Sequence, residues 1–231
     1  MKGSQEPRIR IEPERVSTDG KDAAELMSAY GNHLDPWQEL VVECWLGLDD
    51  DGNYNVTSAG LALPRQNGKN VCLEARELYG LLINGEKILH TAHQVKTFKK
   101  SFRRLSAIFE DKRYPEIMAM VKNIRRTNGE EAIELLNGGC IEYSARSRQA
   151  ARGFDGISLV VFDEAQELQD DQLEAIMASS TPIAAEKSSI NPEIFLSAKR
   201  LQSNADTFSS RYWIPTLRKG PTKTASVARI P

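Results

Sequence analysis

Apolar residues along the 231-residue chain recur with two different periods, which predicts an alternation of helices and strands. Helical stretches have apolar positions three or four residues apart, and strand stretches are short apolar runs bounded by Gly, Pro, Asn or Asp. The predicted helices cover residues 23–30, 35–48, 68–83, 94–109, 114–121, 168–178 and 204–214. The predicted strands cover residues 54–63, 87–92, 124–127, 132–136, 140–144, 158–162 and 194–197.

The order of these elements predicts an α/β fold with a mostly parallel central sheet flanked by helices. Asn128-Gly129 and Asn137-Gly138-Gly139 are turn signals, so the three short strands around them are expected to form a β-hairpin extension. Residues 1–22 are polar and predict an extended or poorly ordered arm, and residues 216–231 resemble a linker. One domain, residues 23–215, is expected between them.

Composition excludes several classes of protein. The apolar share of 40% and the charged share of 27% are those of a globular chain, not of a disordered one. No apolar run approaches the roughly 18 residues that a membrane span needs, so no membrane partner is expected. Cys44, Cys72 and Cys140 are scattered, and the three histidines form no ligand pattern. Reduced thiols are therefore expected, and a zinc site is not.

The net charge of −2 argues against a general polyanion binder, but the basic residues are unevenly spread. Residues 95–104, 122–126 and 145–152 are locally basic. Patches of this kind can contact phosphates without making the whole protein basic. The alternative for each patch is a solvated helix face or loop.

A buried strand is predicted to end in two adjacent carboxylates. The apolar run 159–162 is typical of a strand inside a parallel sheet, and Asp163 and Glu164 follow it directly. Open α/β sheets bind their ligands at this carboxyl end of the strands. In P-loop NTPases the first acid helps to hold Mg²⁺ and a neighbouring acid can position the attacking water. The alternative is a strand that runs into a helix capped by Asp163.

A possible phosphate-binding loop, residues 63–70, follows a strand and begins a helix, which is the context that a P-loop requires. Its backbone N–H groups would cradle phosphates, and Lys69 would reach the β- and γ-phosphates. The candidate nucleotide-binding residues are Arg65, Gln66, Asn67, Gly68, Lys69 and Asn70. The alternative is an ordinary turn before a helix.

Two positions of this loop depart from the general P-loop pattern. Leu63 stands where the pattern has Gly, and Asn70 stands where it has Ser or Thr. Asn70 would offer Mg²⁺ a neutral amide oxygen or a water-mediated contact, or it signals weak or absent hydrolysis. The loop and the acidic pair nevertheless occur in the right order, with 93 residues between Lys69 and Asp163. Together they predict a site for ATP and Mg²⁺.

Gln38 lies about 30 residues before the loop, after Asp35, Pro36 and Trp37. A glutamine here resembles the adenine-sensing glutamine of helicase-like and packaging ATPases, since an amide can pair with the N6 and N7 edge of adenine. The alternative is a solvent-facing residue in the first turn of a helix.

In combination these motifs resemble the ATPase domain of the large terminase subunit of tailed bacteriophages, over residues 30–215. The residues that carry the resemblance are 36–38, 63–69, 152–155, 160–166 and 195–198. It implies a P-loop NTPase fold of the ASCE or RecA-like type. It also implies a motor that hydrolyses ATP to move double-stranded DNA into a procapsid in the host cytoplasm.

The resemblance also implies roles for individual residues. Arg65 would contact the phosphates, Asp163 would serve Mg²⁺ and Glu164 would activate water. Ser197 and Ala198 would fall at the coupling motif, although they depart from its commoner Ser/Thr-rich form.

Ring ATPases of this kind use an arginine finger from a neighbouring subunit. Arg152 is the first candidate, with Arg146 and Arg148 as runners-up. The alternative for all three is contact with phosphate or DNA, or simple solvation. A homo-oligomeric ring, expected to be a pentamer, would work with portal and small terminase subunits. The family also carries a C-terminal nuclease domain, for which these 231 residues leave no room, so no nuclease activity is expected.

Two other functions stay open. A helicase-like, DNA-dependent ATPase would need a second RecA-like domain, which does not fit in this chain. A weakly hydrolysing, nucleotide-binding assembly module is compatible with Asn70.

Overall fold

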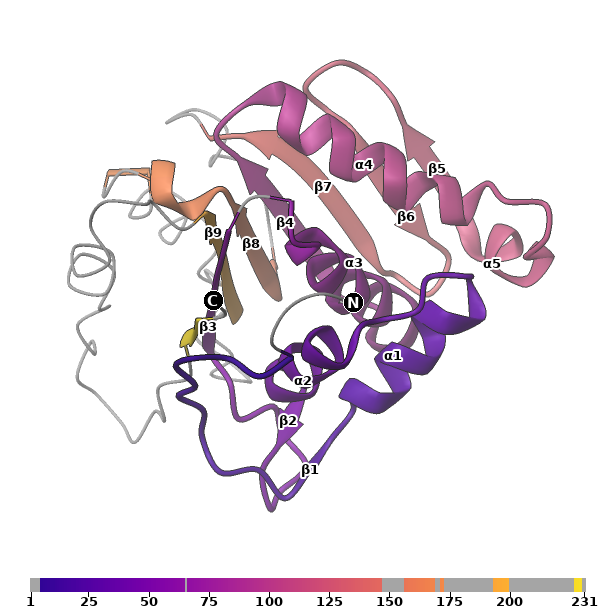
Figure 1. Ribbon diagram of the computed structural model, residues 1–231. Helices are drawn as coiled ribbons and strands as arrows, with labels where there is room; N and C mark the ends of the chain where they lie inside the picture. Colours follow the sequence, from indigo (N-terminus) through magenta and orange to yellow (C-terminus); the bar gives the residue numbers. More distant parts are fainter. Residues whose placement is uncertain are drawn as a thin grey trace.

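An eight-stranded sheet forms the centre of the molecule (Figure 1). The computed structural model describes residues 5–64, 66–146, 156–168 and 171–172, together with the backbone of residues 193–199 and 227–229. The strand order is β10-β3-β9-β8-β4-β7-β6-β5. The strands are β3 (Ser58–Leu63), β4 (Lys87–Ala92), β5 (Val121–Arg125), β6 (Ala132–Leu135), β7 (Cys140–Ala145), β8 (Leu159–Asp163), β9 (Glu193–Lys199) and β10 (Val227–Arg229).

The pairing confirms a mostly parallel sheet with a hairpin extension. All pairs from β10 to β7 are parallel, whereas β7-β6 and β6-β5 are antiparallel. Short connections that contain the predicted turn residues join β5 to β6 and β6 to β7, and Gly129 and Gly138 in them have positive φ. Strand β9 lies between β3 and β8, although it follows both of them in the sequence.

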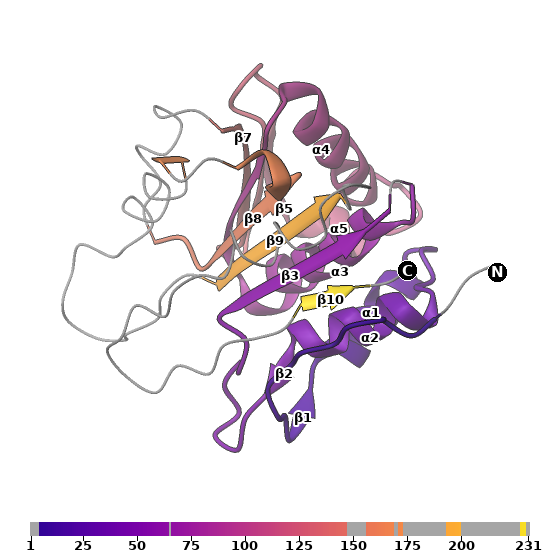
Figure 2. The ribbon, with the colours of Figure 1, turned by 60° about the vertical axis from the view of Figure 1, so that its left-hand side comes forward.

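Five helices lie on one side of this sheet (Figures 1 and 2). They are α1 (Gly20–Ala29), α2 (Pro36–Trp45), α3 (Lys69–Tyr79), α4 (Val95–Phe109) and α5 (Pro115–Met120). Helix α4 shows why they form there, since Phe98, Phe102, Leu105 and Phe109 recur at helical spacing and are all buried in the core. A shared apolar core therefore joins these helices to the sheet.

Strand β8 is buried on both faces, as its unbroken apolar run predicted. Leu159 and Val161 join the core beneath the helices. Val160 and Phe162, which alternate with them, are also fully buried but do not belong to that cluster. No helix within the described residues is long and apolar enough to cross a membrane.

The N-terminal arm is more ordered than its polar composition predicted. Strand β1 (Ser17–Thr18) pairs antiparallel with β2 (Gly47–Leu48), and α1 begins at Gly20. A Cβ at Gly20 would lie 2.3 Å from Cα of Glu43, so this glycine permits the close approach of α1 to α2. The arm therefore begins the packed domain before residue 23.

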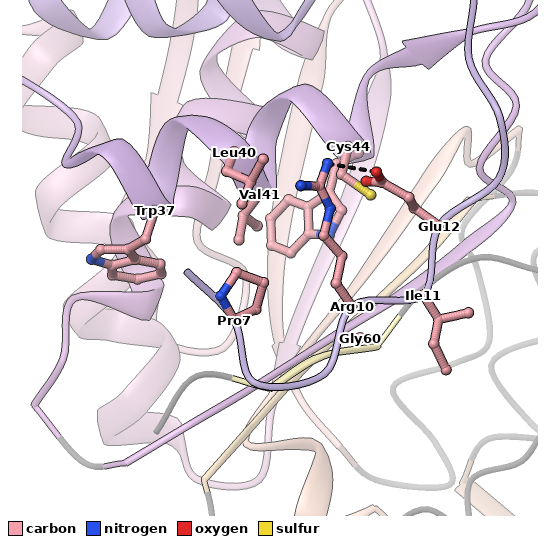
Figure 3. Close-up of a pocket in the computed structure, with 10 residues that line it drawn as sticks. Pro7, Arg10, Ile11, Glu12, Trp37, Leu40, Val41, Cys44 and Gly60 are labelled. Atoms are coloured by element: carbon pink, nitrogen blue, oxygen red, sulfur yellow. Dashed lines mark ion pairs between the residues drawn. The ribbon is translucent and has the colours of Figure 1, made fainter. Parts of the chain in front are cut away.

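Residues 7–12 of the arm lie across α2 (Figure 3). Pro7 and Ile11 line a small apolar cavity of about 20 Å³ with Trp37, Val41 and other residues of α2. Burial of the apolar surface of α2 accounts for this docking, which short-range sequence pattern does not reveal.

The bounds of two further elements also differ from the predicted ones. The predicted strand 54–63 begins only at Ser58, because Tyr54 pairs with Leu48 in an isolated antiparallel bridge outside the central sheet. Helix 68–83 ends at Tyr79 and continues as a π-helical turn (Gly80–Asn84).

The C-terminal part is described only in places. Of predicted helix 168–178, only Asp171 and Gln172 are described as helical, and helix 204–214 lies outside the described residues. Within the segment expected to be a linker, residues 227–229 form β10 beside β3. Backbone pairing to this sheet edge replaces a free linker at these three residues.

Candidate nucleotide-binding site

The phosphate loop and the acidic pair meet at one edge of the sheet. Strand β3 leads through the loop into α3, which begins at Lys69, and β8 ends at Asp163. The Lys69 Nζ atom lies 2.7 Å from Asp163 Oδ1. Strand β9 runs between them, with Ser197 in register with both Leu61 of β3 and Asp163 of β8. The backbone of the predicted coupling motif thus lies between the two halves of the site.

The Lys69–Asp163 pair is an ion pair in a nearly water-free position. Asp163 is only 1% exposed. Burial alone would raise the pKa of Asp163, but the ammonium of Lys69, with a smaller contribution from His90, holds that pKa below its ordinary value. The carboxylate is therefore charged at neutral pH and attracts cations.

Asn70 also faces Asp163. Its Nδ2 atom is 3.4 Å from Asp163 Oδ2, and rotation of the amide would turn its oxygen to the same place. One carboxylate and one amide oxygen suit Mg²⁺, which takes oxygen ligands and normally keeps waters and substrate phosphates. Within the described part of the chain no three His, Cys, Asp or Glu side chains cluster around a possible metal position. The residues at this edge therefore fit a metal ion that has few protein ligands.

The loop backbone has an unusual shape. Gln66 has φ 64° and Gly68 has φ 76°, both in the left-handed region, on either side of Asn67. A non-glycine residue in this region is strained, and such strain concentrates at ligand sites. At Gly68 a Cβ would lie 2.8 Å from Gln38 Nε2. The loop therefore requires glycine there. Arg65 lies outside the described residues.

Gln38 supports this loop from beneath. It is 4% exposed, its Oε1 accepts a hydrogen bond from Asp35 N at 2.7 Å, and its Nε2 donates to Gly68 O at 3.1 Å. The alternative of a solvent-facing glutamine is therefore wrong. The amide keeps one further N–H and one lone pair, and contact with adenine stays a prediction.

Glu164 is held by three elements. Its φ of 58° is left-handed, and its N–H donates to Asp163 Oδ1 at 2.8 Å. Thr97, at the start of α4, donates its hydroxyl to Glu164 Oε2 at 3.2 Å. Arg146 Nη2 donates to the carbonyl oxygens of Asp163 and Glu164. The helix-cap alternative for Asp163 is not observed, because the 3-10 helix Ala165–Glu167 begins after Glu164 and the Asp163 carboxylate faces Lys69.

Arg146 occupies a different place from that of an arginine finger. Its side chain is 7% exposed and bound to carbonyls of its own chain, so it braces the acidic turn. Arg148 and Arg152 lie outside the described residues.

Sequence reasoning missed Thr97 and the bracing role of Arg146. Thr97 follows β4, and β4 pairs directly with β8, so its position at the same sheet edge was the available signal.

Two ion pairs, one of them fully buried, join α3 to its neighbours. Glu77 Oε1 lies 2.5 Å from Nδ1 of His90 on β4. Burial alone would lower the pKa of His90, but the Glu77 carboxylate raises it above its ordinary value. Glu74 Oε1 lies 2.5 Å from Nε of Arg104 on α4, and burial raises the pKa of Glu74 to about 7, against the opposing guanidinium. These pairs fix the helix that begins at Lys69.

Three comparisons with known proteins were made, and only the one with solved structures found matches. No protein-family model and no curated protein sequence matches the chain. Among solved structures, the large terminase of bacteriophage HK97 matches with a TM-score of 0.59 and 20% identity. That match covers 78% of this chain and 38% of the HK97 chain, so this chain spans well under half of that protein.

Two further structures share the fold. The large terminase ATPase domain of Thermus phage P74-26 matches with a TM-score of 0.58 and 16% identity, over 89% of this chain and 81% of that one. The UvsW helicase of bacteriophage T4 matches with a TM-score of 0.50 and 14% identity, over 81% and 61% of the two chains. The likeness shows that the chain has the P-loop NTPase fold of large terminase ATPase domains.

Proposed function

We propose that this chain is the ATP-hydrolysing motor domain of a terminase large subunit, which drives double-stranded DNA into a procapsid. The observation that carries the proposal is the meeting of Lys69, Asp163 and Glu164 at one edge of the sheet. A lysine at the start of a helix, beside two acids at the end of another strand of the same sheet, is the arrangement that phosphoryl transfer to water needs. The terminase fold supports the choice of motor.

ATP would lie with its phosphates over the loop that ends at Gly68. Backbone N–H groups of Gln66, Asn67 and Gly68 and of the first turn of α3 would bind the phosphates. Lys69 would exchange its contact with Asp163 for the β- and γ-phosphates. Arg65 would add a second cation, and Gln38 would hold the loop while offering its remaining N–H to adenine.

Asp163 and Asn70 would hold Mg²⁺, which neutralises phosphate charge when it is bound. Asp163 is suited to this role because Lys69 already keeps it ionised in a buried position. Asn70 supplies a neutral ligand where a hydroxyl is usual.

Glu164 would accept a proton from the water that attacks the γ-phosphate. Its carboxylate projects from a left-handed turn directly after Asp163, and Thr97 fixes its orientation. Ser197 and Ala198, whose strand lies between β3 and β8, would carry the effect of hydrolysis to the DNA-gripping parts.

Assembly into a ring, as a pentamer, would complete the site with Arg152 from a neighbouring subunit. The transition state needs an additional cation, and within the described residues Arg146 is committed to its own chain. Portal and small terminase subunits in the host cytoplasm would be the other partners. Turnover that rises more than linearly with protein concentration, and that Arg152→Ala removes, supports this part. Normal hydrolysis by Arg152→Ala at ring-forming concentration contradicts it.

The experiment that tests the function is Mg²⁺-dependent ATP turnover by the whole chain, with and without duplex DNA. Lys69→Ala is the variant for the phosphate site, and Lys112→Ala, a distant lysine, is the matched control. We expect turnover that needs Mg²⁺, that Lys69→Ala abolishes and that Lys112→Ala preserves. If the parent chain binds nucleotide but shows no turnover in every one of these conditions, the proposal is contradicted. That result favours the nucleotide-binding assembly module that Asn70 leaves open. Turnover coupled to strand separation favours a helicase-like ATPase.

A further inference from the structure

Helix α4 presents a basic stripe to solvent. Its buried face, with Phe98, Phe102 and Leu105, packs into the core. Lys96, Lys100 and Arg103 lie on the exposed side of the helix. Residues separated by four and then three positions share one face of a helix. We call these three side chains the α4 stripe.

Within the part of the chain that the structure describes, the α4 stripe has no acidic partner. None of its three side chains makes a hydrogen bond or an ion pair there. The neighbouring Lys99 and Arg104 differ, because Lys99 contacts Asn128 and Glu131, and Arg104 contacts Glu74. Three uncompensated charges on a chain of net charge −2 therefore gather on one helix face.

The basic patch at residues 122–126 is neutralised by acidic side chains of the same chain. On and beside β5, Lys122 lies 3.9 Å from Glu134, and Arg125 lies 3.6 Å from both Glu134 and Glu142. Arg126 pairs with Glu110 at 2.5 Å. A surface that already satisfies its cations with its own carboxylates gains less from a polyanion than a surface that does not.

We propose that the α4 stripe binds the sugar-phosphate backbone of duplex DNA. This inference rests on the proposed function, and it specifies which surface of the domain meets the DNA. The stripe spans about 10 Å along the helix axis. Duplex DNA carries one negative charge per about 1.7 Å of its axis, so a stripe of that length faces several phosphates. Lysine and arginine side chains bind phosphates without reading sequence, as packaging requires.

The location of the stripe connects it to the hydrolysis site. Thr97, which follows Lys96, holds Glu164, and Arg104, which follows Arg103, holds Glu74 of α3. Because α4 is a rigid helix packed into the core, DNA on its outer face contacts the same element that orients Glu164.

The test is the salt dependence of duplex DNA binding by the whole chain, measured by fluorescence anisotropy between about 50 and 200 mM salt. The stripe variant combines Lys96→Gln, Lys100→Gln and Arg103→Gln. The matched control removes the same number of charges with Lys122→Gln, Arg125→Gln and Arg126→Gln. Thermal unfolding of both variants checks that they fold, and Lys96→Arg with Lys100→Arg tests rescue.

We expect the stripe variant to bind at least about tenfold more weakly at the lowest salt. The slope of log affinity against log salt should shrink by up to about 2.7, since each phosphate contact contributes about 0.9. The control should keep most of the parent slope, and the Lys-to-Arg variant should bind like the parent.

Four results overturn the inference. They are no DNA binding by the parent chain, an unchanged slope in the stripe variant, an equal loss in the control, and binding of poly-glutamate as tight as that of DNA. Turnover of ATP by the parent without DNA is measured separately. If the parent hydrolyses ATP but the stripe fails, only this inference falls; if the stripe binds DNA but turnover is absent, the proposed function falls.

Discussion

The ammonium of Lys69 lies 2.7 Å from the carboxylate of Asp163, although 94 positions separate the two residues in the sequence. Lys69 begins α3, which follows β3, and Asp163 ends β8. Because both strands are parallel members of one sheet, their carboxyl ends meet at the same edge. The pair thus defines the site from two distant segments.

The first prediction concerns this ion pair. Lys69→Ala leaves the Asp163 carboxylate buried without its main counter-charge, so the free energy of unfolding at pH 7 should fall by ~3 kcal/mol. In the parent, the pKa of Asp163 is depressed, so its stabilising contribution is present above the unfolded value and is lost as pH falls through the folded one. The variant should lose this acid sensitivity.

Urea unfolding from pH 2 to pH 7 measures both effects. Lys96→Ala, at an exposed lysine on α4, is the control and should unfold like the parent. Equal stability of Lys69→Ala and the parent at pH 7 would show that the pair does not stabilise the fold.

The second prediction concerns Gly68. Gly68→Ala forces a Cβ into a residue with φ 76° and to 2.8 Å from Gln38 Nε2, so the loop must move. Strain in the left-handed region costs ~1–2 kcal/mol, and the displaced loop should weaken nucleotide binding by at least about tenfold. Gly129→Ala is the matched control, because Gly129 has φ 87° but nothing within 4 Å. It should lose stability without losing affinity for ATP, measured by calorimetry. Equal affinities of the two variants would contradict the bracing role of Gln38.

The third prediction concerns the pH dependence of stability. Burial raises the pKa of Glu74 to about 7, so the folded state holds this proton more tightly than the unfolded state. The stability of the parent should therefore decrease as pH rises from about 4.5 to about 7, by at most ~3 kcal/mol from this group. Glu74→Gln cannot titrate, so the difference in unfolding free energy between variant and parent should grow across this interval. A difference that is constant with pH would refute the raised pKa.

The fourth prediction concerns Thr97. Thr97→Val removes the hydroxyl that donates to Glu164 but keeps the shape of the side chain. A hydrogen bond to a charged group contributes ~1.5–3 kcal/mol, so kcat for ATP should fall by at least about tenfold while KM stays close to the parent value. Thr97→Ser keeps the hydroxyl and should restore turnover. If valine turns over ATP as fast as serine does, Thr97 has no part in orienting Glu164.

Much of the fold follows from local pattern. The strands predicted at 87–92 and 158–162 match β4 and β8 to within a residue. For β8 the signal was an unbroken apolar run between polar boundaries, which is typical of a strand buried on both faces. The hairpins followed from their Asn-Gly turns. The N-terminal arm was harder to predict, because its place depends on the apolar side of α2, which is remote in sequence.

Some residues of the candidate site could likewise be predicted from short motifs, and others could not. Lys69, Asp163 and Glu164 were predictable because each belongs to a short motif with a fixed chemical role. The bracing contacts of Gln38, Thr97 and Arg146 were not, since each joins elements that meet only in the folded sheet. The pairing of His90 with Glu77 was also not predictable, because the two residues belong to different elements and form no sequence motif.

The proposed role of Glu164 is the central claim, and Glu164→Gln tests it most directly. The substitution keeps the size of the side chain and its contact with Thr97 but removes the proton acceptor. Single-turnover hydrolysis of Mg-ATP is the measurement, with nucleotide affinity determined on the same samples. We predict that hydrolysis slows by at least about a hundredfold while ATP still binds. Hydrolysis at the parent rate by Glu164→Gln, with ATP bound, would contradict the account.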